Sequence, residues 1–131
     1  MPALVCPDPY GELAKLSGTR KTIDLPALEP LGLLPSVLLR ETAYGRPCRA
    51  FHRAGVEVEL AVGQPVWSFQ GAVRVETVRA NLDALLHTGV AGPVMVTDRP
   101  GAEHGLWLLD GHHALLAARL AGVAVTADLW R

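Results

Sequence analysis

Hydrophobic and polar residues follow regular patterns mainly in the second half of the chain. From Val56 to Val62 apolar and polar residues alternate, which predicts a strand with one buried face. Residues 65–69 predict a second extended run. Between Val75 and Leu86 the apolar side chains recur mostly three or four positions apart, and Gly89 follows. This spacing predicts an amphipathic helix that ends in a left-handed glycine cap.

Similar patterns continue to the C-terminus. Val94–Thr97 and Leu106–Leu109 predict strands, and a helix is expected to begin at Asp110, acting as its N-cap, and to stop at Gly122. Residues 123–129 alternate again and predict a final strand. The expected order over 56–131 is β-β-α-β-β-α-β. We therefore expect an α+β fold, a small mixed sheet with helices packed on it, rather than a doubly wound nucleotide fold.

The first 55 residues hold seven of the ten prolines and show weak periodicity. Short helices are expected around Tyr10–Leu16 and Pro35–Arg40, and a strand at Lys21–Leu25. Prolines interrupt the apolar stretch 25–39, so it is not a membrane span, and it is a candidate homodimer surface. Because 131 residues barely support two cores, we expect one domain, with an irregular part (1–55) and a core part (56–131).

Composition narrows the function classes. Half of the residues are hydrophobic and the net charge is −1, so the chain can bury a core and has no global basic field that would recruit nucleic acid. Basic and aromatic residues concentrate only between Arg40 and Arg53, which leaves nucleic acid as a weaker alternative partner. The N-terminus lacks the features of a signal peptide, and a cytoplasmic location is expected.

The candidate functional residues are concentrated in the run Asp110-Gly111-His112-His113, between a predicted strand and a predicted helix. Backbone N–H groups at a helix start carry partial positive charge, Gly111 permits close approach, and two imidazoles add donors, which is how phosphate sites are built. The alternative is that Asp110 only caps the helix and the histidines lie on the surface. Adjacent helical histidines point about 100° apart, so no dedicated metal site is predicted.

From Gln64 to Arg131, about half of the chain, the sequence resembles the ParB/sulfiredoxin superfamily. The resemblance rests on a helix (81–88), Gly92-Pro93-Val94-Met95-Val96, a strand (107–109), and the run from Asp110 to Ala118, followed by Gly122 and a last strand. The order of these elements agrees with the order predicted above from hydrophobic patterns alone.

The resemblance implies a nucleotide-phosphate pocket. Its members include CTP-binding partition clamps, sulfiredoxins that use ATP and a cysteine, free-serine kinases and nucleases. By position Gly111, His112 and His113 would line the phosphates, and the segment from Gln70 to Arg74 would supply a polar residue and an arginine.

This chain also departs from the family pattern. It has Ala114 where relatives place a phosphate-binding arginine, so Arg74 or Arg79 would have to supply that charge. It has no motif cysteine, so sulfiredoxin chemistry is not expected. No helix-turn-helix segment follows the last strand, so a complete partition protein is not expected either.

The leading hypothesis is a stand-alone domain that binds ATP, ADP or CTP, with or without Mg²⁺, at the Asp110–His113 helix start. It would have phosphotransferase or NTP-hydrolysing activity, with Asp110, His112 and His113 as catalytic residues. One alternative is a catalytically inactive accessory module of a phage or plasmid, with a protein partner or as a homodimer. Another is a metal-dependent nuclease of the ParB-like kind.

Overall fold

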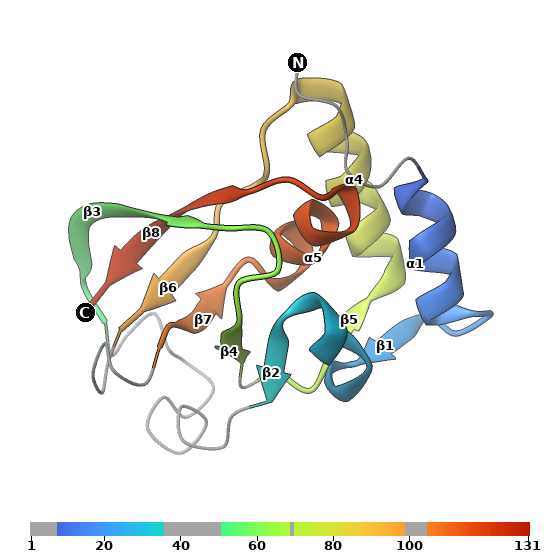
Figure 1. Ribbon diagram of the computed structural model, residues 1–131, viewed down its shortest axis with the longest axis horizontal. Helices are drawn as coiled ribbons and strands as arrows, with labels where there is room; N and C mark the ends of the chain where they lie inside the picture. The colour runs from blue at the N-terminus through green and yellow to red at the C-terminus, as the bar shows by residue number, and fades with distance from the viewer. Residues whose placement is uncertain (1–7, 36–50, 69, 99–104) are drawn as a thin grey trace.

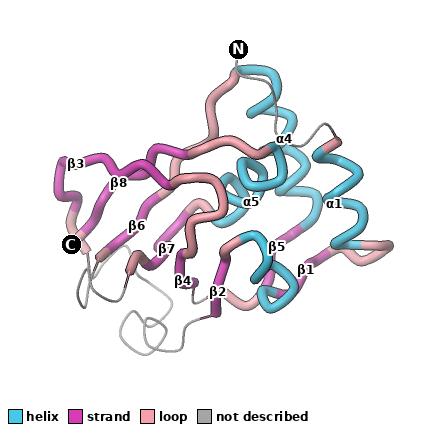
Figure 2. Tube along the Cα trace, viewed as in Figure 1, coloured by secondary structure: helices cyan, strands magenta, loops and turns pink. Residues whose placement is uncertain are grey.

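The computed structural model describes residues 8–35, 51–68, 70–98 and 105–131, and it has the expected α+β class (Figures 1 and 2). Its elements are, in chain order, α1 (Pro9–Ser17), β1 (Thr22–Asp24), the 3₁₀ helix η1 (Leu25–Leu31), β2 (Leu33–Pro35), β3 (Arg53–Leu60), β4 (Val66–Ser68), β5 (Ala72–Arg74), α4 (Val75–Thr88), β6 (Met95–Thr97), β7 (Trp107–Asp110), α5 (His112–Ala121) and β8 (Val125–Trp130).

The main sheet is mixed and has the strand order β2-β4-β7-β6-β8-β3, while β1 and β5 form a separate two-stranded sheet. One face of the main sheet packs against α4 and α5. Leu108 faces these helices and belongs to the large hydrophobic cluster, whereas its neighbours Trp107 and Leu109 join Phe51 in a small cluster. Since alternate residues of a strand point to opposite faces, the small cluster lies on the other side of the sheet.

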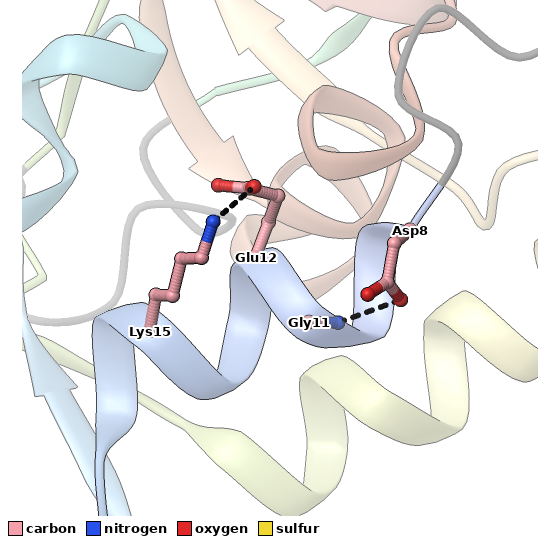
Figure 3. Close-up of polar contacts among 4 residues, drawn as sticks. All are labelled: Asp8, Gly11, Glu12 and Lys15. Atoms are coloured by element: carbon pink, nitrogen blue, oxygen red, sulfur yellow. Dashed lines mark hydrogen bonds and ion pairs between the residues drawn. The ribbon is translucent and has the colours of Figure 1, made fainter.

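Helix α1 is specified locally and confirms the helix expected around Tyr10–Leu16 (Figure 3). The carboxylate of Asp8 accepts the backbone N–H of Gly11 at 3.0 Å, and Pro9 occupies the first turn, where its missing N–H is not needed. Glu12 and Lys15 form an ion pair at 3.1 Å on the exposed side. The opposite side buries Leu13 in the core that α1 shares with α4 and α5.

The N-terminal part joins the sheets of the core part. The strand expected at Lys21–Leu25 is confirmed as β1, and β2 pairs in parallel with β4. Between β1 and β2 lies η1, which the sequence did not predict. Its Leu25 and Leu28 are fully buried, as is Leu33 in β2. These leucines are therefore not available to the homodimer surface proposed for 25–39. Residues 36–39, and all of the expected helix except Pro35, which ends β2, lie outside the described residues.

The prediction that residues 56–62 bury one face of their strand is wrong. The strand runs over β3 instead, at the edge of the sheet, and its first five residues are exposed. Val56 is 52% exposed, and only Leu60 is buried. The face of an edge strand is buried only as far as a neighbouring layer covers it, and here coverage is limited to the end of the strand. An additional short strand, β5, precedes α4.

The remaining expected elements are confirmed with small shifts of their ends. Helix α4 ends at Gly89, which adopts the left-handed conformation predicted for its cap, and α5 likewise ends at Gly122. The helix α5 is the most central element, since nine of its ten residues are buried. In the parts of the chain described, no helix is long and apolar enough to cross a membrane.

Candidate functional site

The chain passes from β7 into α5 through Gly111, and the predicted role of Asp110 as the N-cap is wrong. Gly111 itself occupies the N-cap position with a φ of +94°, and no side chain caps the helix. Asp110 is the last residue of β7, is exposed, and accepts the N–H of Gly111 at 2.8 Å. The strand continues one residue further than expected, and the Asp110 carboxylate makes no hydrogen bond to the N–H groups of the first helical turn.

The small size of Gly111 serves the protein's own packing. A Cβ at this position would lie 2.5 Å from the carbonyl oxygen of Pro93 and 2.9 Å from the Cα of Val94. Both atoms are backbone atoms of the segment that leads into β6. The close approach to Gly111 that we expected of a phosphate is therefore made by the backbone of Pro93 and Val94.

His112 points into the core, where it is 3% exposed. Its Nε2 lies 2.5 Å from the hydroxyl oxygen of Ser68, which also accepts the N–H of Gln70 at 3.1 Å. Burial and, to a smaller extent, the neighbouring His113 lower the pKa of His112 to about 4, against an opposing effect of Asp110. His112 is therefore neutral near pH 7. A buried imidazole already engaged by a buried serine fits poorly with the predicted donation to a phosphate.

Ser68, the buried partner of His112, is a residue that the sequence did not indicate. It ends β4, and the parallel pairing of β4 with β7 places it opposite Leu108, two positions before Asp110. No local pattern around residue 68 reveals that pairing. Gln70, predicted to contact the ligand, instead uses its side-chain amide to donate to the carbonyl oxygen of Ala72 at 2.6 Å.

Ala114 is also buried, at 5% exposed. Its methyl group faces Gly92, where an added Cβ would lie 3.3 Å from it. An arginine at position 114, as the family pattern has, would therefore have to displace the segment before β6. Ala114 is therefore a residue that fits the local packing.

His113 connects the start of α5 to the start of α4. Its Nε2 accepts the backbone N–H of Arg74 at 3.1 Å, so the proton of the neutral ring is on Nδ1. Burial lowers the pKa of His113, the Arg74 guanidinium lowers it further, and Asp110 opposes the shift. The structure thus brings Asp110, His113 and Arg74 together, and it separates them from Arg79 by one helical turn.

Arg74 and Arg79 line a cavity of about 520 Å³ that the sequence did not predict and that we name the basic cavity. It is lined by the turn from α1 to β1 and by the start of α4. The strands β1 and β5, which pair with each other, lead into these two segments (Figure 1). In the register of these strands Thr22 lies opposite Arg74, which brings Arg20 and Lys21 to the same cavity. The full lining is Ser17, Gly18, Thr19, Arg20, Lys21, Thr22, Arg74, Val75, Glu76 and Arg79.

Most of the cations of the basic cavity are free to bind a ligand. The side chains of Lys21, Arg74 and Arg79 form no hydrogen bond or ion pair with any residue in the described ranges. Arg20 donates to the carbonyl oxygens of Leu16 and Ser17 at the end of α1. The start of α4 adds partial positive charge, because its N-cap residue is Arg74, whose side chain has no acceptor, and no side chain caps the helix.

A dedicated metal site is not part of this arrangement. Over residues 8–35, 51–68, 70–98 and 105–131, no three His, Cys, Asp or Glu side chains gather closely enough to hold an ion. Cys48 and most of the basic and aromatic segment between Arg40 and Arg53 lie outside those ranges.

Comparisons of the chain with protein-family models, with curated proteins and with solved structures return no match. The resemblance of residues 64–131 to the ParB/sulfiredoxin superfamily therefore stays a prediction from the sequence. What the site does has to be argued from its own chemistry.

Proposed function

We propose that the chain binds a phosphorylated small molecule, with a nucleotide as the leading candidate, and holds its phosphate groups in the basic cavity. The observation that carries the proposal is the charge of the lining, which contains four basic side chains and one acidic side chain, Glu76. That is a formal excess of three positive charges in a chain whose net charge is −1. A concave site with this local charge favours an anion.

The size and backbone of the cavity support the same ligand class. Its volume of about 520 Å³ lies within the range of small-molecule pockets, about 300–1,000 Å³. Several hydroxyls and the first turn of α4 add hydrogen-bond donors suited to phosphate oxygens. The three residues that contribute most are Lys21, Arg74 and Arg79, because no other described group engages their charges.

The ParB/sulfiredoxin resemblance favours ATP, ADP or CTP as the nucleotide, in a cytoplasmic protein with the fold of that superfamily. In this proposal Arg74 replaces the family arginine missing at Ala114. Asp110 and His113 do not line the basic cavity but neighbour Arg74, which does, and we assign to them any action on a bound phosphate or on Mg²⁺ carried by it. We assign Gly111 and His112 to packing rather than to ligand contact.

An inactive interaction module is the second candidate, and Ala114 favours it, because its buried position leaves no room for the guanidinium that relatives use on phosphate. In that case the basic cavity would bind an anionic group without turnover. A ParB-like nuclease has no such supporting observation among the described residues.

The test is thermal unfolding of the purified protein with ATP, ADP, CTP, GTP, pyrophosphate and sulfate, each with and without Mg²⁺. A ligand at about 100 times its Kd adds about 2.7 kcal/mol of stability, which raises the Tm by several degrees in a domain of this size. We expect nucleotides and pyrophosphate to produce this shift, and Arg74→Ala and Arg79→Ala to reduce it.

Arg53→Ala is the matched control, since it removes the same charge from an exposed site on β3 outside the basic cavity. It should leave the shift intact. Asp110→Asn should retain binding and lose any turnover of ATP or CTP. The proposal is wrong if no phosphate compound stabilises the wild type, or if Arg53→Ala weakens binding as much as Arg74→Ala.

A further inference from the structure

A second set of contacts, on the surface shared by α1 and α4, bears on Arg79. The two helices run side by side (Figure 1), and the hydroxyl of Tyr10 in α1 donates to the Oδ1 of Asp83 in α4. Asp83 lies four residues, or about one turn, after Arg79 on the same helix. The three side chains therefore neighbour one another, with Arg79 on the side of the basic cavity.

Arg79 and Asp83 have the spacing at which opposite charges on a helix form an ion pair. They form none here: the ion pairs recorded among the described residues lie elsewhere, and the Arg79 side chain has no partner. The phenol of Tyr10 donates to one oxygen of the Asp83 carboxylate, Oδ1. The pKa of Tyr10 is raised, mainly by this hydrogen bond, and the Arg79 charge opposes the rise, which is consistent with a guanidinium nearby.

We propose that Tyr10 is a positioning residue for the basic cavity: its hydrogen bond to Oδ1 of Asp83 holds that carboxylate toward α1, and this keeps the Arg79 guanidinium available to an anionic ligand. This inference rests on the proposed function, because it concerns ligand binding in the same cavity. It assigns helix α1, which lies outside the segment that resembles a known family, a direct part in ligand affinity.

The physical consequence is a competition between two partners for Arg79. Without the phenol, Asp83 is free to pair with Arg79 across one helical turn, and a ligand must break that pair before it can use the guanidinium. Pairs of this kind on exposed helix surfaces change equilibria by about twofold. Tyr10→Phe should therefore weaken ligand binding about twofold, although it changes no charge near neutral pH.

Asp83→Asn should act in the opposite direction, because it removes the competing carboxylate and its charge. The two variants should then differ about fourfold in Kd. The decisive comparison is the double variant. Tyr10→Phe made in an Asp83→Asn background, or in an Arg79→Ala background, should have no further effect, since either background lacks one member of the competing pair.

The experiment is isothermal titration calorimetry of inorganic pyrophosphate at low ionic strength, which limits screening of exposed charges. Each variant is first checked for a cooperative unfolding transition, so that a loss of folding is not read as a loss of binding. The expected result is the opposite effect of the two single variants and the absence of an effect of Tyr10→Phe in both backgrounds.

Two outcomes overturn the inference in distinguishable ways. If the wild type binds pyrophosphate and Arg79→Ala weakens it, but Tyr10→Phe binds like the wild type, Tyr10 has no positioning role and the proposed function stands. The same conclusion follows if Tyr10→Phe weakens binding equally in the wild-type and Asp83→Asn backgrounds, because its effect would then come from a destabilised α1 and not from the competition for Arg79. If the wild type binds neither pyrophosphate nor any of the nucleotides, both proposals fall.

Discussion

Replacement of Gly111 by alanine separates a ligand-binding glycine from a packing glycine. Alanine at a φ of +94° is strained, and this left-handed strain costs about 1–2 kcal/mol. The new methyl would also lie 2.5 Å from the carbonyl oxygen of Pro93 and 2.9 Å from the Cα of Val94. That backbone cannot shift freely, because the Val94 carbonyl oxygen accepts the N–H of Asp128 in β8 at 2.9 Å.

Forced overpacking of this kind costs about 1–3 kcal/mol, so together with the backbone strain the total destabilisation should be about 2–5 kcal/mol. The Tm should fall by about 10 °C, with no ligand present. Gly89→Ala is the matched control, since Gly89 has a φ of +77° and no atom within 4 Å of an added Cβ. It carries the backbone strain without the clash and should cost about 1 kcal/mol.

Urea unfolding of the two variants at pH 7, followed by circular dichroism, measures both free energies. The difference between them isolates the contact of position 111 with Pro93 and Val94. If Gly111→Ala is no less stable than Gly89→Ala, that contact does not constrain the fold. That result would favour the alternative interpretation, in which Gly111 is small to allow a ligand to approach.

Two further predictions concern buried polar groups. The pKa of His112 is about 4 in the folded chain and 6.5 ordinarily, so the unfolded chain binds this proton more tightly. The neutral buried His112 therefore stabilises the folded state by about 3 kcal/mol above pH 6.5, and this stabilisation is lost as the pH falls toward 4. Urea unfolding across this range should show the loss, His87→Gln at an exposed position of α4 should keep it, and a wild-type stability that is flat with pH would contradict the burial of His112. Arg119, which is 5% exposed, donates to the carbonyl oxygens of Leu31 at 3.1 Å and Gln64 at 2.7 Å, so Arg119→Met should cost about 3 kcal/mol by leaving both without their donor. The exposed Arg53→Ala should cost under about 0.5 kcal/mol in the same assay, and equal costs for the two variants would show that the buried contacts contribute nothing.

The sequence predicted those elements whose signals are local. Helix α4 combines an apolar repeat with a terminal glycine, and α1 carries its own cap at Asp8, so neither depends on knowing the rest of the fold. The faces of strands were harder, because burial of a face depends on neighbouring layers. The alternation around Val56 is real, yet β3 lies at the sheet edge, and most of its residues remain exposed.

Contacts between distant segments explain what the sequence could not predict in the candidate site. The hydrogen bond from His112 to Ser68 depends on the pairing of β4 with β7, and that pairing decides whether the histidine faces ligand or core. Likewise, Arg74 and Arg79 were predicted from their positions near a motif. Their neighbours Arg20 and Lys21 follow only from the pairing of β1 with β5.

The basic cavity therefore depends on both parts of the chain. Arg74 and Arg79 lie within the segment 64–131 that carries the resemblance, but the opposite wall comes from residues 17–22. Those residues are held in place by two contacts with the start of α4: β1 pairs with β5, and the carbonyl oxygen of Lys21 accepts the N–H of Val75 at 2.9 Å. This hydrogen bond also fills one N–H position of the α4 start with protein. Under the proposed function, ligand specificity would therefore depend on the N-terminal segment as well as on the start of α4.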